Sequence, residues 1–194
     1  AVYQAYDLSV SGGTEASNYY TSFSYTNDLG RSVINAFDRI TGRMNFGQKI
    51  GKYIELNTNI NVSSSNKEGF NDSRALGNNY FLQSRNLLWG LYWPTDYGTG
   101  LPWTARYGSY AYNPVYYNNE WENWSKTQRV FANETVTIKI LPELILKSIF
   151  SFDNTQTLDH LYYSALHFSG TATQGSVSEN STKISELVSS TTLN

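Results

Sequence analysis

The sequence predicts an all-β protein in which antiparallel strands form part of a large transmembrane β-barrel with long extracellular loops. Three observations predict this fold class. Segments of about ten residues alternate between polar and apolar side chains, as in strands whose two faces meet different surroundings. The connections between them are alternately short and long. Aromatic residues are abundant, with 16 tyrosines, nine phenylalanines and five tryptophans in 194 residues, which fits the aromatic girdles of such barrels.

The strands can be placed in chain order from the two-residue period. They are expected near 2–11, 18–26, 37–47, 53–63, 127–140 and 144–153, with the start of another near 183–194. The pattern is clearest in 53–63, where apolar residues such as Ile54 alternate with Glu55 and several asparagines. In 127–140 the otherwise apolar face is interrupted by Glu134.

Strand length favours a membrane protein. Ten residues extend ~33 Å, and a tilt of ~40° leaves ~25 Å along the barrel axis, which matches the apolar band of outer-membrane barrels. Strands of soluble proteins are usually about half as long. The segments are therefore expected to cross the outer membrane in contact with its lipid.

Connection lengths predict the orientation in that membrane. The short connections are 12–17, 48–52 and 141–143, and the longer ones are 27–36, 64–126 and 154–182. Outer-membrane barrels have short periplasmic turns and longer extracellular loops, so the longer connections are expected outside the cell. In the first short turn, Gly12 and Gly13 are expected to supply the positive φ angle of the turn.

The number of strands predicts a segment of a larger barrel. Six strands and the start of a seventh do not reach the eight of the smallest usual membrane barrel. An open edge in lipid would leave backbone groups unpaired, at a cost of several kcal/mol each. We therefore expect the remaining strands to come from elsewhere in a longer chain.

Several stretches carry a more specific pattern. They are LSVSGGTE at 8–15, NYYTSFSY at 18–25, NDLG at 27–30, DRITGRMN at 38–45, YIELNTNINV at 53–62, QRVFAN at 128–133 and LILK at 144–147. In order and spacing these stretches resemble the early barrel of the SusC/RagA-type TonB-linked outer-membrane transporters. The two long loops match that family in position and length.

The resemblance implies a parent protein with about 22 strands, an N-terminal plug domain inside the barrel and a segment that contacts TonB. It also implies a SusD-like surface lipoprotein that closes over the barrel as a lid. Members of the family import oligosaccharides or peptides, and the sequence does not choose between a glycan and a peptide ligand. Arg39 and Arg43 share one strand face, so they are expected to point into the lumen and contact the plug or its solvent layer. Alternatively, they are solvated wall residues.

The longest loop offers the most plausible ligand contacts, because aromatic rings stack on sugars and grip peptide side chains and long loops are often functional. The candidate ligand-binding residues are Trp89, Tyr92, Trp93, Trp103, Tyr107, Trp121 and Trp124. The same aromatic residues could instead pack the loop against itself or against a partner subunit.

No catalytic, metal or cofactor site is expected. The two histidines, His160 and His167, lack a metal-ligand spacing and are expected to be exposed loop residues. Glu120 and Glu122 are two residues apart, which more often indicates surface charge than the carboxylate pair of a glycosidase. A net charge of −2 gives no basic surface for nucleic acid, so a non-enzyme without a nucleic-acid partner is expected.

Two alternatives remain open from the sequence. A soluble extracellular carbohydrate-binding β-sandwich would explain the aromatic loop, but it would leave the strand lengths and the alternation of short and long connections unexplained. A hydrolase that uses Glu120 or Glu122 has the least support.

Overall fold

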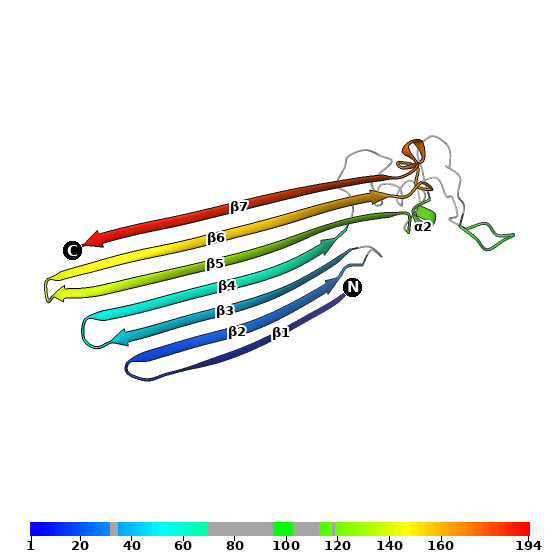
Figure 1. Ribbon diagram of the computed structural model, residues 1–194. Coiled ribbons are helices and arrows are strands. Elements are labelled where there is room, and N and C mark those ends of the chain that lie inside the picture. Colours follow the sequence, from blue (N-terminus) through cyan, green and yellow to red (C-terminus); the bar gives the residue numbers. More distant parts are fainter. Residues whose placement is uncertain (32–34, 70–94, 103–112, 118) are drawn as a thin grey trace.

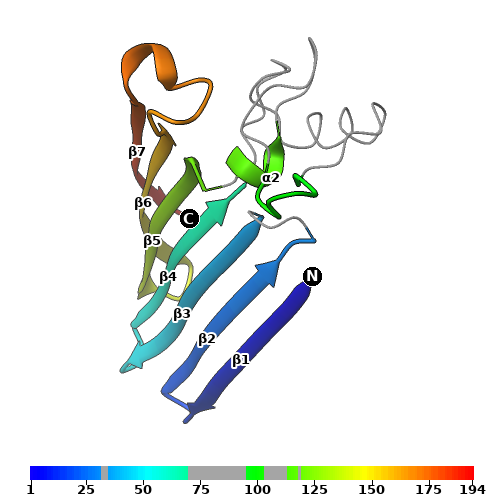
Figure 2. The same cartoon turned by 90° about the vertical axis from the view of Figure 1, so that its right-hand side faces the viewer.

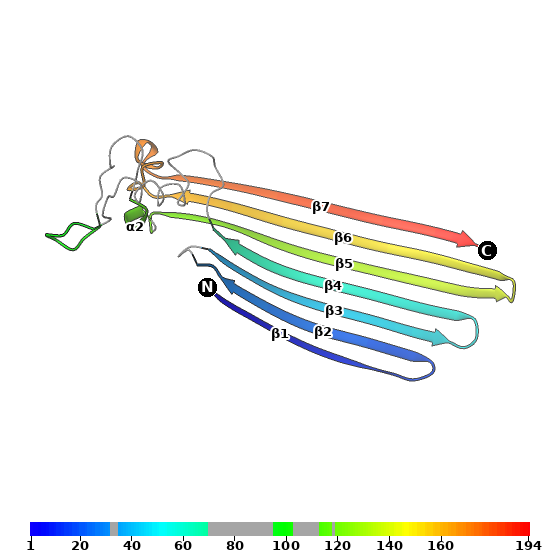
Figure 3. The ribbon, with the colours of Figure 1, turned by 180° about the vertical axis from the view of Figure 1, so that it is seen from behind.

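The described residues of the chain form a single antiparallel sheet of seven strands that follow one another in chain order (Figures 1 and 3). The structure, a computed structural model, describes residues 1–31, 35–69, 95–102, 113–117 and 119–194. Its strands are β1 (Val2–Gly13), β2 (Ser17–Leu29), β3 (Ala36–Ile50), β4 (Ile54–Glu68), β5 (Trp121–Leu141), β6 (Leu144–Tyr163) and β7 (Ser176–Leu193). A four-residue helix, α2 (Pro114–Tyr117), and a short 3-10 turn, η1 (Thr171–Thr173), lie outside the sheet.

Several strands extend beyond the predicted segments. β5 begins at Trp121, six residues before the predicted start at 127, and β6 continues to Tyr163, ten residues beyond 153. Along these extensions polar residues occur on both faces, so the contrast that defines a strand in the sequence disappears while the ladder of hydrogen bonds continues. Trp121 and Trp124 are consequently strand residues and not loop residues.

All short turns lie at one end of the sheet and the longer connections lie at the other (Figure 1). The first turn is closed by Thr14, whose Oγ1 accepts a hydrogen bond from the Ser17 N–H at 3.1 Å. Gly12 and Gly13 belong to the strand and lack the positive φ expected of them, in contrast to Gly51 (φ 62°) in the second turn.

Close approach explains the two adjacent glycines instead. A Cβ at Gly12 would lie 2.6 Å from the Tyr19 hydroxyl, and a Cβ at Gly13 would lie 2.6 Å from the Ser17 carbonyl oxygen. Both distances are too short for non-bonded atoms. The atom near Gly13 belongs to the backbone, so this position needs glycine for space and not for backbone freedom, whereas the Tyr19 side chain near Gly12 can turn aside.

The two faces of the sheet differ in chemistry. We call the face that carries Arg39 and Arg43 the polar face. One row of directly paired residues on it is Ser11, Tyr20, Asn45, Asn59, Asn133, Ser151 and Val188. The opposite, apolar face carries large hydrophobic side chains that are exposed on the isolated sheet. They include Tyr6, Leu8, Phe23, Met44, Val62, Val130, Phe150, Phe152 and Leu187.

The sheet is curved and its hairpins are staggered (Figures 1 and 2). In the row of paired residues just described, Ser11 lies three residues before Thr14, where the first turn begins. Asn45 lies six residues before Gly51, and Asn133 lies nine residues before Pro142. Each hairpin is therefore displaced by three residues, or about 10 Å, relative to the hairpin before it.

Among the described residues, no helix is long and apolar enough to cross a membrane.

Candidate functional site

The first candidate site lies on the polar face around β3. Arg39 and Arg43 are both exposed there. Thr26 and Ser65 lie directly opposite Arg39 on the neighbouring strands, while Ser22 and Asn61 lie opposite Arg43. The strand period thus places both arginines on one face, as predicted, and surrounds them with neutral hydrogen-bonding groups. Their expected contact with a plug domain stays a prediction.

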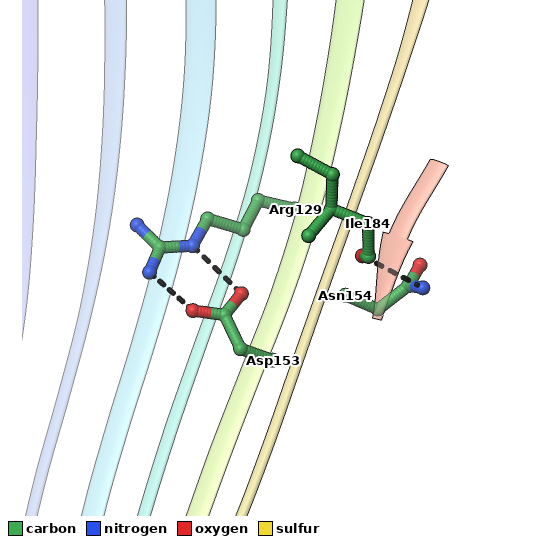
Figure 4. Close-up of polar contacts among 4 residues, drawn as sticks. All are labelled: Arg129, Asp153, Asn154 and Ile184. Carbon is green, nitrogen blue, oxygen red and sulfur yellow. Dashed lines mark hydrogen bonds and ion pairs between the residues drawn. The ribbon is translucent and has the colours of Figure 1, made fainter. Parts of the chain in front are cut away.

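A ladder of side-chain hydrogen bonds continues the polar face across β5 and β6. The Arg129 guanidinium donates Nε–H to Asp153 Oδ1 at 2.9 Å and Nη2–H to Asp153 Oδ2 at 2.5 Å (Figure 4). Ser125 donates to Asp159 at 2.6 Å, and Asn133 donates to Ser151 at 2.6 Å.

The next residue, Asn154, shows the strand alternation directly. It points away from the Arg129–Asp153 pair and donates a hydrogen bond to the Ile184 carbonyl oxygen at 3.4 Å (Figure 4). Asp153 and Asn154 therefore project from opposite faces of the sheet. Along β5 and β6, side chains of the polar face already form hydrogen bonds with one another.

The second candidate site is an aromatic cluster at the end of the sheet that carries the long connections. The Trp121 ring stacks on Tyr163 with centroids 6.4 Å apart, and Tyr163 stacks on His167 at 4.5 Å. Tyr117 of α2 and Phe168 close around the imidazole at 5.2 and 4.1 Å. The cluster joins α2, β5, β6 and the segment that follows β6.

His167 is the centre of this cluster and not the exposed loop residue that the sequence suggested. Its residue exposure is 3%, and its Nδ1 accepts a hydrogen bond from the Ser169 N–H at 3.0 Å. Burial lowers the pKa of His167 from 6.5 to about 4, because an uncompensated charge is costly among aromatic rings. The imidazole is therefore neutral near pH 7 and acts as a packing element.

The backbone around His167 is equally constrained. A Cβ at Gly170 would overlap the Ser164 carbonyl oxygen, so no larger residue fits there without displacing the segment. The Ser164 hydroxyl in turn donates to the Glu120 carboxylate, just before β5 begins. Glu120 is thus engaged in holding the two chain segments together.

The opposite face of β5 carries a separate cluster. Trp124 pairs in register with His160, and the two rings stack at 4.6 Å and 10°. Lys126 Nζ lies 4.5 Å from the centre of the Trp124 ring, an arrangement typical of a cation–π contact. The His160 side chain is 15% exposed and contacts Glu179 at 3.0 Å and Glu122 at 3.9 Å. His160 is therefore a strand residue, which corrects the expectation of an exposed loop histidine.

A carboxylate also lies within the apolar face. Thr58 Oγ1 donates a hydrogen bond of 2.5 Å to Glu134 Oε2 across β4 and β5. The pair borders a groove of about 260 Å³ that Ile60, Phe150 and Phe152 also line. The break in the apolar pattern that the sequence shows at Glu134 is thus compensated by a neighbouring hydroxyl.

The other aromatic candidates cannot be placed in the same way. Trp89, Tyr92, Trp93, Trp103 and Tyr107 lie outside the described residues. Within the described part of the chain, no group of three His, Asp or Glu side chains is arranged to hold a metal ion. Sequence reasoning did not single out Tyr163 or Phe168. The available signal was the run of aromatic residues between Tyr162 and Phe168, which is followed by Gly170.

Comparison with known proteins bears on the fold. No protein-family model and no curated protein matches the chain. The structure is similar to the RagAB peptide transporter, with 22% identity and a TM-score of 0.64, over 84% of this chain and 18% of that one.

A second structure, the RagAB peptide importer in its "open-open" state, matches with 23% identity and a TM-score of 0.62, over 81% of this chain and 18% of that one. The chain thus spans less than a fifth of the length of the structures it matches. The predicted fold class, antiparallel strands that form part of a large β-barrel, is confirmed.

Proposed function

We propose that this chain is part of the wall of a TonB-dependent outer-membrane importer of oligosaccharides or peptides that acts with a SusD-like surface lipoprotein. The polar face would line the lumen, and the apolar face would contact lipid. TonB would act through parts of the parent protein other than those described above.

The stagger of the hairpins carries this proposal. A displacement of about 10 Å over two inter-strand spacings of about 4.8 Å corresponds to a strand tilt of about 45°, if the short turns lie in one plane. Strands of closed barrels tilt by about 35–45°. A sheet with this tilt, curvature and order of strands has the geometry of a barrel wall.

The distribution of polarity supports a membrane location. On β5 the apolar face runs from Val130 to Ile138, interrupted by Glu134, and it spans about 20 Å along the axis at that tilt. This is close to the height of about 25 Å typical of the apolar band of outer-membrane barrels. Beyond it, toward the long connections, the same face carries Gln128 and Lys126, as expected where a strand leaves the lipid.

The soluble carbohydrate-binding sandwich is not favoured. Such a fold packs the apolar faces of two sheets against each other. The described part of this chain forms one sheet, and its apolar face has exposed side chains such as Leu8 at 69% and Phe150 at 49%. Surrounding lipid would cover such a face. The aromatic cluster near His167 is also consistent with a loop core and requires no sugar.

Of the two ligand classes, the structural neighbours favour peptides, since both are described as transporters or importers of peptides. Trp121 and the aromatic candidates at 89, 92, 93, 103 and 107 would line the extracellular entrance. A surface lipoprotein would cover the same end, where the long connections gather.

Envelope fractionation and uptake assays test the proposal together. The native polypeptide should be found in the outer membrane with a mass several times 22.0 kDa, and it should co-purify with a surface lipoprotein. Deletion of its gene, or of TonB, should abolish uptake of labelled peptides or oligosaccharides while uptake of a small porin substrate continues. A soluble species near 22.0 kDa would contradict the proposal and revive the carbohydrate-binding module.

A further inference from the structure

We infer that Arg39 and Arg43 form an anion-binding strip on the polar face that selects acidic peptides as ligands of the proposed importer. The inference rests on the proposed function, and it names the ligand chemistry that this part of the wall favours.

The first observation is the composition of the strip. It consists of three consecutive polar-face positions on each of β2, β3 and β4, which lie opposite one another in register. These nine residues are Ser22, Ser24, Thr26, Arg39, Thr41, Arg43, Asn61, Ser63 and Ser65. Seven are neutral hydrogen-bonding residues, two are arginines and none is acidic. The strip therefore presents positive charge together with hydroxyl and amide groups that can donate to an anion.

The second observation is that both guanidinium groups are uncompensated within the described chain. The ion pair that an arginine forms there is Arg129–Asp153. The nearest polar-face carboxylates in the register are Asp28, diagonal to Arg39, and Asp7, two strands away on β1. Neither forms an ion pair with the strip. The positive charge of the strip is therefore available to bind an anionic group that does not belong to the described chain.

Arg129 shows what a compensated arginine of this wall looks like. It occupies the same polar face on β5, and both of its hydrogen bonds go to the Asp153 carboxylate. The sheet thus places a carboxylate beside Arg129 but none beside Arg39 or Arg43. Guanidinium groups bind carboxylates through two parallel hydrogen bonds, so a carboxylate is the complementary group for Arg39 and Arg43 as well.

The spacing defines the ligand further. Residues 39 and 43 are four positions apart on one strand, which separates them by about 13 Å. In an extended peptide, side chains at positions i and i+4 lie on one side at the same separation. A peptide with Asp or Glu at i and i+4 would therefore engage both arginines along β3.

The test uses the full-length protein in its outer membrane, with three labelled seven-residue peptides as probes. One carries glutamates at i and i+4, a second carries them at i and i+1, and the third has glutamine at both positions. Uptake is compared for the native protein and for R39Q/R43Q. The charge-conserving R39K/R43K reports on charge alone, and R31Q, which removes an exposed arginine from the β2–β3 connection, is the matched control.

The native protein should prefer the i, i+4 acidic peptide over the other two. In R39Q/R43Q the KM for that peptide should rise about threefold to tenfold while the glutamine peptide is unaffected, with partial recovery in R39K/R43K and no change in R31Q. An equal loss of all three peptides, or reduced assembly in the outer membrane, would overturn the inference and assign the arginines to contacts with another part of the protein. If the native protein takes up labelled oligosaccharides but no peptide, this inference is overturned while the proposed function stands. If it takes up neither, the proposed function itself fails.

Discussion

Trp121 and Trp124 lie three residues apart on β5 and project from opposite faces of the sheet. Trp121 pairs with Tyr163 on the polar face, whereas Trp124 pairs with His160 on the apolar side. The two tryptophans were grouped as ligand-contact candidates from the sequence, but a single ligand bound on one face of the sheet cannot stack on both. Trp124 moreover already stacks on the His160 imidazole and contacts the Lys126 ammonium.

The two tryptophans should consequently respond differently to truncation. Trp121→Ala should weaken ligand binding by about 0.5–1.5 kcal/mol, the range typical of an aromatic stacking contact. Trp124→Ala should leave ligand affinity unchanged and instead loosen the contact of β5 with β6. Equilibrium binding of a labelled ligand to the purified full-length protein measures both variants. Equal losses in the two would contradict the placement of Trp124 on the apolar face.

Removal of one partner of the Thr58–Glu134 hydrogen bond should destabilise the protein, whereas removal of both partners together should have little effect. Thr58→Val leaves a carboxylate without its donor on the apolar face, and we expect a loss of about 1–3 kcal/mol in the free energy of unfolding. The double variant T58V/E134V replaces both polar groups and should regain most of that loss. Urea unfolding in lipid vesicles measures the cycle, and additive effects of the two substitutions would show that the side chains are not coupled.

The segment around His167 should lose stability in acid. Its histidine has a pKa of about 4 when folded and would have its ordinary value of 6.5 when the segment opens. The opened form therefore gains a proton as the pH falls below 6.5, while the folded form does not until about 4. Stability should be complete above pH 6.5 and decline progressively toward pH 4.

Hydrogen exchange of the Ser169 and Gly170 amides, corrected for intrinsic rates, reports this opening. Protection should be lower at pH 4.5 than at pH 7.5 in the native protein. His167→Phe removes the titrating group, and its protection should be independent of pH over the same interval. That control also separates the histidine from the nearby Glu120 carboxylate.

Two glycine substitutions should differ sharply although they make the same chemical change. Gly170→Ala places a Cβ against the Ser164 carbonyl, whereas a Cβ at Gly42 meets no atom within 4 Å. The first should cost about 1–3 kcal/mol or displace the segment after β6, and the second should be nearly neutral. Proteolytic sensitivity of residues 164–175 distinguishes the variants, and similar behaviour of the two would contradict the packing described for Gly170.

The sequence allowed the strands to be predicted where the two faces differ in polarity. That contrast holds from Ile54 to Val62 and from Val130 to Ile138, where one side is mainly apolar and the other mainly polar. The exceptions are Thr58 and Glu134 on the apolar side and Phe131 on the polar side. The contrast ends where strands such as β5 continue with polar residues on both faces. Strand ends therefore could not be located from hydrophobicity, although hydrogen bonds such as Thr127–Thr157 at 3.1 Å continue the pairing.

The candidate site was only partly predictable for a different reason. The common face of Arg39 and Arg43 follows from local periodicity alone. The burial of His167 depends on α2, which comes from a distant part of the chain, and no local pattern carries that information. The opposite orientation of Trp121 and Trp124 follows from parity once the strand is known to begin at Trp121.

The stagger of the hairpins has a consequence for the outer rim of the wall. If the turns share one plane, the height of a residue above it depends on its distance along the strand from the turn. β3 extends 15 residues from its turn and β5 extends 21, a difference of six residues or about 14 Å in height at the inferred tilt. The rim thus rises from β3 to β5, and a molecule that approaches from the end with the longer connections would meet a low side next to the arginine strip and a high side at Trp121.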